Sequence, residues 1–164
     1  MQIGKFRLGL RTLKTAFAVM IIITSFYFFN RPPFVAALAA VFALRESWDK
    51  TLNFAKVRLI SNTVGGGFAL IYFIVREQTN HAPWTSMILL PLLVIVAIVL
   101  LDGFDYNSGV IGAMAALLMI SLNIPAGATI VYVFERIVDT FIGVAVAILI
   151  NRFGSPKNVN QMPK

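Results

Sequence analysis

The chain has 164 residues, of which 59% are hydrophobic and only 13% are charged. A typical soluble domain carries about 25% charged residues, and one core of this size could not cover so much apolar surface. The composition excludes an ordinary soluble enzyme or binding domain, and it excludes a disordered chain, which needs low hydrophobicity. We therefore expect an integral membrane protein whose first partner is the lipid bilayer.

The net charge is +7 and the chain contains no cysteine. Without cysteine there is no disulfide scaffold and no thiolate metal site. A positive net charge would suggest nucleic-acid binding in a soluble protein, but basic residues in a membrane protein mark its cytoplasmic side. The sequence has no phosphate-binding loop, no HExxH motif and no GxSxG motif. We expect no nucleic-acid partner, no metal, no cofactor and no enzymatic activity.

Six apolar stretches predict six transmembrane helices in one domain over residues 1–153, followed by a polar tail over 154–164. The helices are expected over residues 13–30, 33–45, 58–76, 84–101, 108–122 and 128–151. The apolar part of the second helix is about 16 Å long at 1.5 Å per residue, too short for a ~30 Å hydrocarbon core. This helix therefore either continues past Arg45, through an amphipathic segment anchored by Trp48, or does not fully span.

The basic residues predict the orientation of the chain. A cytoplasmic N-terminus places most of the 14 Lys and Arg residues on the inner side. The residues on that side are Lys5, Arg7, Arg11, Lys14, Arg45, Lys50, Lys56, Arg58, Arg152, Lys157 and Lys164. With six spans, both termini are then cytoplasmic in a multi-pass plasma-membrane protein.

Two segments share a pattern, RLISNTVG from Arg58 and RIVDTFIG from Arg136. Each has an arginine, six residues and then a glycine, and each begins the third helix of one half of the chain. Because three helices per half is an odd number, the two halves would run in opposite directions, as in many transporters. The expected fold class is an all-α six-helix transmembrane bundle of two inverted three-helix repeats. A chance match in apolar sequence is the alternative.

The sharpest chemical feature is the charged group of Glu135, Arg136 and Asp139, with Thr140 beside it. Charges inside a membrane are costly and usually face a polar cavity or each other. Residues three and four apart share a helix face. Arg136 is a candidate for binding an organic carboxylate, and Asp139 and Glu135 are candidates for carrying a proton. The alternatives are a structural ion pair and a position in the headgroup region.

The equivalent group in the third helix contains Arg58, Asn62 and Thr63, which are candidate substrate-binding residues. Six glycines are expected at helix contacts, because small residues four apart let helices approach closely. These glycines are Gly65, Gly66, Gly67, Gly109, Gly112 and Gly143. A local break in the third helix that lines a cavity is the alternative for the glycine run. The many small residues also favour a homo-oligomer, a dimer or larger.

Three motifs carry a resemblance to a known family. They are Gly9-x-Arg11-Thr12-x-Lys14-Thr15-Ala16, Arg58-x4-Thr63-x-Gly65-Gly66, and Arg136-x2-Asp139-Thr140-x2-Gly143 with Asn151. In their order and spacing they resemble the N-terminal membrane domain of the bacterial aromatic acid exporter family, in the fusaric acid resistance protein-like superfamily. The resemblance covers about residues 4–153. It implies a six-helix domain in the bacterial plasma membrane and proton-driven efflux of aromatic carboxylic acids.

The first functional hypothesis is therefore a transporter that exports small amphipathic organic anions, namely aromatic carboxylic acids, with the energy of the proton gradient. Arg136 and Arg58 would bind the carboxylate, while Asp139 and Glu135 would carry the proton. A structural or regulatory membrane subunit of the cell envelope, without transport, is the second hypothesis. A passive channel is the third, and it predicts flux that does not respond to a pH gradient.

Overall fold

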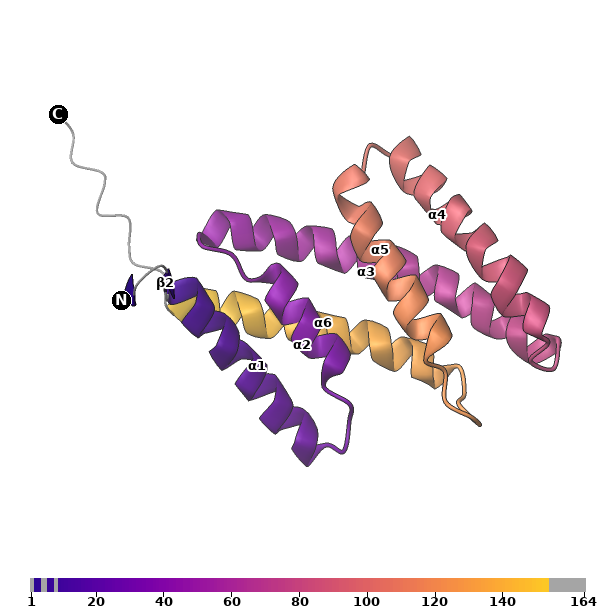
Figure 1. The fold of residues 1–164 in the computed structure, drawn as a ribbon, viewed down its shortest axis with the longest axis horizontal. Helices are drawn as coiled ribbons and strands as arrows, with labels where there is room; N and C mark the ends of the chain where they lie inside the picture. Colours follow the sequence, from indigo (N-terminus) through magenta and orange to yellow (C-terminus); the bar gives the residue numbers. More distant parts are fainter. Residues whose placement is uncertain (1, 4–5, 8, 154–164) are drawn as a thin grey trace. The chain divides into compact units, whose positions relative to one another are not determined.

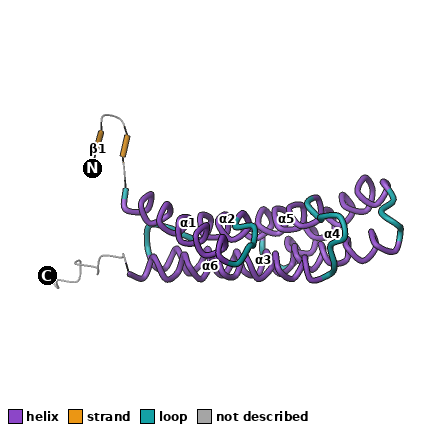
Figure 2. The backbone as a smooth tube through the Cα atoms, turned by 90° about the horizontal axis from the view of Figure 1, so that it is seen from below, coloured by secondary structure: helices purple, strands orange, loops and turns teal. Residues whose placement is uncertain are grey.

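The computed structural model describes residues 2–3, 6–7 and 9–153, which are almost entirely helical (Figure 2). The elements in chain order are β1 Gln2–Ile3, β2 Phe6–Arg7, α1 Leu10–Phe28, α2 Phe34–Ala43, α3 Trp48–Gln78, the π-helical turn η1 Thr85–Leu89, α4 Leu90–Gly103, α5 Asn107–Leu122 and α6 Val131–Phe153 (Figure 1). The two short strands pair antiparallel. The predicted polar tail over 154–164 lies outside the described residues.

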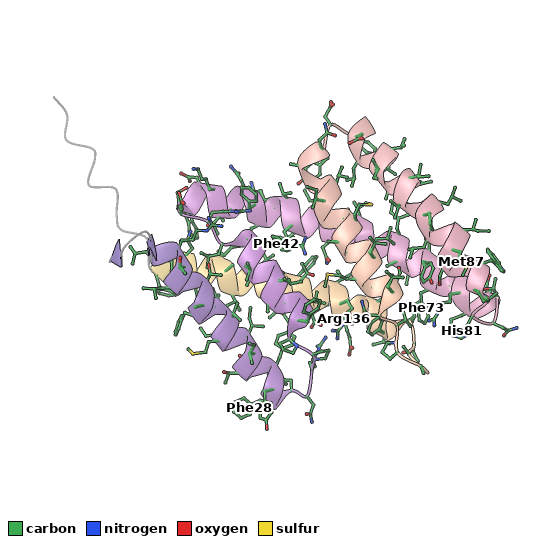
Figure 3. The ribbon with its side chains drawn as sticks, viewed as in Figure 1. Phe28, Phe42, Phe73, His81, Met87 and Arg136 are labelled. Atoms are coloured by element: carbon green, nitrogen blue, oxygen red, sulfur yellow. The ribbon has the colours of Figure 1, made fainter. Side chains whose placement is uncertain are left out.

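Three helical segments are long and apolar enough to cross a membrane: α1, α3, and η1 together with α4. The helices α2 and α5 are apolar but shorter. Large apolar side chains such as Phe28 and Met87 are exposed, and both point outward in Figure 3. Such a surface needs lipid around it. The chain is therefore a helical membrane protein. That it crosses the membrane six times stays a prediction.

The structure corrects the expected extension of the second helix. The helix α2 ends at Ala43 because Leu44 is extended, with ψ 121°. The backbone N–H of Arg45 donates to Thr51 Oγ1 at 3.0 Å instead of continuing the helix. Trp48 is the first residue of α3, so the amphipathic segment forms the first turns of α3 and not the end of α2. A hydroxyl that accepts the Arg45 N–H thus separates the two helices.

The chain divides into two compact units, each described here by itself. The first unit contains the residues up to Ala55 and those from Ile142 onward, and the second contains Lys56–Phe141. In the first unit α1 packs along α2, and in the second α4 packs along α5. Both boundaries fall inside helices, one in α3 and one in α6.

The two units have cores of different composition. The buried face of α2 consists of alanines, which leave room for a close approach by another backbone. The core of the second unit contains larger side chains, including Tyr72 and Phe73 of α3, Leu93 of α4 and Leu117 of α5. Tyr72 is buried with its hydroxyl 2.7 Å from Ser86 Oγ, so its polar end has a partner.

Burial nevertheless follows the same spacing in α2 and α5. On α2 and the residue after it, the buried positions are Ala36, Ala39, Ala40, Ala43 and Leu44. On α5 they are Ala113, Ala116, Leu117, Ile120 and Ser121, after an additional buried Gly109. These five positions have identical intervals in the two helices. The helices α2 and α5, each the middle helix of one half of the chain, therefore bury residues with the same spacing inside their own units.

Candidate functional site

The second unit holds a buried ion pair on α6. Arg136 Nη2 lies 3.1 Å from Asp139 Oδ2, and the two side chains are 7% and 0% exposed. The expected adjacency of these residues is present, because positions three apart share a helix face. Glu135 Oε2 lies 3.8 Å from the same Nη2, but the Glu135 side chain is 45% exposed. Arg136 thus has one buried carboxylate and one that reaches toward the outside of the chain.

An aromatic ring flanks the Arg136 guanidinium. The Arg136 Cζ lies 5.3 Å from the centroid of the Tyr132 ring, within the range of a cation–π interaction. The Tyr132 hydroxyl donates to the carbonyl oxygen of Asn123 at 2.8 Å, which fixes the ring. A guanidinium between a carboxylate and an aromatic face offers both features that an aromatic carboxylate would recognise. Arg136 is the sixth residue of α6, in the second turn of the helix (Figure 3).

The helix α3 contacts α6 directly beside this pair. Buried Asn62 donates through Nδ2 to the carbonyl oxygen of Ile137 at 3.4 Å. A Cβ on Gly66 would lie 2.6 Å from Ile137 Cδ1, so only glycine fits there without a shift of the isoleucine. Asn62 therefore contacts α6 at the residue that follows Arg136.

Arg58 lies one turn before Asn62 on α3 and is buried against α5. A Cβ on Gly112 would lie 3.4 Å from Arg58 Nη1 and 2.9 Å from Ser61 Cβ. Ser61 is also buried, and its hydroxyl donates to the Val57 carbonyl oxygen at 2.6 Å. The missing side chain at Gly112 thus provides the space that the Arg58 guanidinium and Ser61 occupy.

The two threonines among the candidate residues differ in position. Thr140 is buried and donates to the Arg136 carbonyl oxygen at 3.4 Å within α6. Thr63 is exposed on α3 and donates to the Leu59 carbonyl oxygen at 2.9 Å. The structure does not bring Thr63 to the buried pair. Within the described residues there is no group of three or more His, Cys, Asp or Glu side chains that could hold a metal ion.

The glycines predicted at helix contacts are in tight contacts, with one exception. A Cβ on Gly65 would collide with the backbone carbonyl of Ala113, and a Cβ on Gly143 with that of Ala36. Gly66, Gly109 and Gly112 also face atoms too close for a side chain. At Gly67 the packing prediction is wrong, because no atom of the described chain lies within 4 Å of a Cβ there.

A family model described as "Aromatic acid exporter family member 1" matches residues 6–153. The chain belongs to the aromatic acid exporter family. The resemblance carried by the sequence motifs is thereby confirmed, and the match includes Arg58, Arg136 and Asp139. This exporter-family chain is a membrane protein of the aromatic acid exporter type, which indicates a transporter rather than an enzyme. No curated protein and no solved structure matches it.

The exporter-family chain has a second buried polar cluster that the sequence analysis did not predict. In the first unit, Lys14 Nζ donates to Asn151 Oδ1 at 2.9 Å, and Asn151 Nδ2 donates to Thr51 Oγ1 at 2.8 Å. Asn151 and Thr51 are fully buried. The sequence offered one signal for this cluster, the amide of Asn151 at the end of the apolar run of α6. A buried amide needs hydrogen-bond partners. These three residues lie too far apart in sequence for any spacing to connect them.

Proposed function

We propose that this chain exports aromatic carboxylic acids across the bacterial plasma membrane and couples the export to the proton gradient. The observation that supports this function is the buried Arg136–Asp139 pair beside the Tyr132 ring. A guanidinium holds a carboxylate through two parallel hydrogen bonds, and a carboxylate within a membrane protein can exchange a proton.

Export against an inward proton gradient requires exchange, in which one proton enters for each anion that leaves. In the proposed cycle the substrate carboxylate leaves Arg136 on the outer side, and Asp139 then takes up a proton from that side. Asp139 releases this proton to the cytoplasm before Arg136 binds the next substrate there. In the loaded form the positive charges of Arg58 and Arg136 balance the carboxylates of Asp139 and the substrate.

The neighbouring residues have supporting roles in this proposal. Glu135 is near Arg136 and half exposed, so it suits the transfer of a proton between water and the buried Asp139. Arg58 supplies a second buried positive charge for the substrate carboxylate, and Asn62 supplies an amide. Thr140 is a buried hydroxyl in the same part of α6. Exposed Thr63 is the weakest of the proposed substrate contacts.

We also propose that the two halves of the chain are repeats. Arg58 and Gly65 have the same separation as Arg136 and Gly143, and both glycines face an alanine carbonyl of the middle helix of the other half. The matching burial of α2 and α5 supports the same relation. Inverted orientation of the halves, six spans and cytoplasmic termini belong to this proposal. Because the chain has no cysteine, single introduced cysteines and a membrane-impermeant thiol reagent can test each loop.

Transport in proteoliposomes tests the proposed function. We expect labelled 4-hydroxybenzoate to accumulate when the lumen is more acidic than the outside. Passive diffusion of a weak acid gives the opposite result, accumulation in an alkaline lumen, and therefore cannot imitate the expected signal. Equilibration that ignores the gradient would indicate a passive channel. No flux above that of empty liposomes, from folded protein, would favour a structural or regulatory subunit. The proposed homo-oligomer is tested separately by the mass of the purified protein in detergent.

A further inference from the structure

A second feature of the molecule lies in the first unit and plays no part in the proposed transport. The start of α1 carries Arg11 and Lys14, which are three residues apart and share a helix face. Arg45 follows α2, and its guanidinium stacks on the Phe54 ring with Cζ 3.8 Å from the centroid. Burial lowers the pKa of Arg45, and the positive charge of Arg11 lowers it further. Arg11 and Arg45 are therefore close enough to repel each other.

A buried network holds Lys14 and the backbone of Arg45 in place. Lys14 donates to Asn151 of α6, Asn151 donates to Thr51 of α3, and Thr51 accepts the backbone N–H of Arg45. Asn151 Nδ2 also donates to the Ser47 carbonyl oxygen at 3.3 Å. The beginnings of α1 and α3 and the end of α6 are thus joined through side chains that are fully buried. An anchored charge loses less conformational freedom when it binds a ligand.

No carboxylate neutralises this group within the described residues. Glu46 and Asp49 are close in sequence, but neither forms an ion pair with Arg11, Lys14 or Arg45 among the residues that the structure describes. The Lys14 ammonium has three N–H donors, and Asn151 takes one of them. The other two donors of Lys14 have no acceptor among the described residues and can bind an anion.

An open apolar groove begins at Lys14. It has a volume of about 660 Å³ and is lined by Leu13, Lys14 and Phe17 of α1 and by Ile150 and Phe153 of α6. Lys14 is the one polar residue in this lining. Leu13, Phe17 and Phe153 are exposed, so the groove is open along its length. A ligand that matches this surface has an anionic head and an apolar chain.

We infer that this site, Arg11, Lys14 and Arg45 with the groove between α1 and α6, binds an anionic phospholipid. The phosphate would lie against Lys14 and the two arginines, and an acyl chain would lie in the groove. Basic pockets between membrane helices recognise anionic head groups in this way. A second copy of the same face would bring Lys14 toward Lys14, which is unfavourable. A free phosphate would leave the apolar groove unused.

Native mass spectrometry of the full chain in detergent tests this inference. We expect phosphatidylglycerol to stay bound under conditions that remove phosphatidylcholine with the same acyl chains. Arg11→Gln should weaken phosphatidylglycerol binding about five-fold, the effect of one basic residue near an anionic surface. Arg11 is exposed and forms no part of the buried network, so this variant should fold. Lys56→Gln removes an exposed charge of α3 outside the site and should change nothing.

Two further variants separate the head-group contact from the groove. Lys14→Gln should weaken phosphatidylglycerol binding, and Lys14→Arg should restore it. Phe17→Ser should shorten the retention of the lipid without changing its preference for a negative head group. Equal binding of the two lipids, or equal loss in Arg11→Gln and Lys56→Gln, would overturn the inference. Displacement of the lipid by millimolar inorganic phosphate would also overturn it, because the site would then bind the free anion.

Discussion

The Arg-x6-Gly segments of α3 and α6 resemble each other in burial and packing, and they differ at one position that can titrate. Arg58 and Arg136 are both buried, and Gly65 and Gly143 each face an alanine carbonyl. Three residues after the arginine, α3 has Ser61 and α6 has Asp139. The Ser61 hydroxyl bonds to its own helix, whereas the Asp139 carboxylate pairs with Arg136. At equivalent positions of two similarly packed helices, α6 therefore has a titratable carboxylate and α3 has a neutral hydroxyl.

Among the variants considered, replacing Arg136 should lower the free energy of unfolding the most. Arg136→Met leaves Asp139 buried without its guanidinium, and loss of one partner of a buried pair costs about 3–5 kcal/mol. The fall should be visible in thermal unfolding in detergent. In the double variant Arg136→Met/Asp139→Leu the stability should largely return, because both members of the pair are replaced by apolar side chains.

Glu135→Gln is the matched control for this series. Glu135 is half exposed and its oxygen is 3.8 Å from Arg136, so the change should cost less than about 1 kcal/mol. A loss as large as that of Arg136→Met would contradict the assignment of Asp139 as the main partner.

The glycines test whether the two segments pack alike. Gly65→Ala and Gly143→Ala each place a methyl group against a backbone carbonyl and should destabilise by about 1–3 kcal/mol. Gly67→Ala has open space and should be neutral or stabilise by up to about 1 kcal/mol, through helix propensity. Melting temperatures of the three purified variants check the predicted difference in sign. Similar losses in all three would show that the contacts of Gly65 and Gly143 do not matter.

The smallest expected difference in stability is between alanine variants of two adjacent residues of α3. Asn62→Ala removes a buried donor to Ile137 and should cost about 1 kcal/mol. Thr63→Ala changes an exposed hydroxyl bonded to its own helix and should stay within about 0.5 kcal/mol. Unfolding of both variants under the same conditions decides whether α3 contacts α6 through Asn62.

The sequence predicted the features that depend on composition and short spacing. The apolar stretches indicated the helices, and the separation of Arg136 and Asp139 predicted their contact. The length of α3 was missed because the amphipathic segment anchored by Trp48 was assigned to the second helix, and apolar spacing does not show which neighbouring helix such a segment belongs to. Gly67 was misjudged because three consecutive glycines face different sides of a helix, and only burial distinguishes them. The cluster of Lys14, Thr51 and Asn151 could not be predicted, because its members come together only through tertiary packing.

The central claim is that Asp139 couples substrate movement to protons, and two transport modes of Asp139→Asn test it most directly. Counterflow of labelled 4-hydroxybenzoate against unlabelled substrate needs binding and movement but no proton. We predict that Asp139→Asn keeps counterflow and loses accumulation driven by an acidic lumen, while Ser61→Ala keeps both. Accumulation by Asp139→Asn at the unsubstituted level would contradict the account.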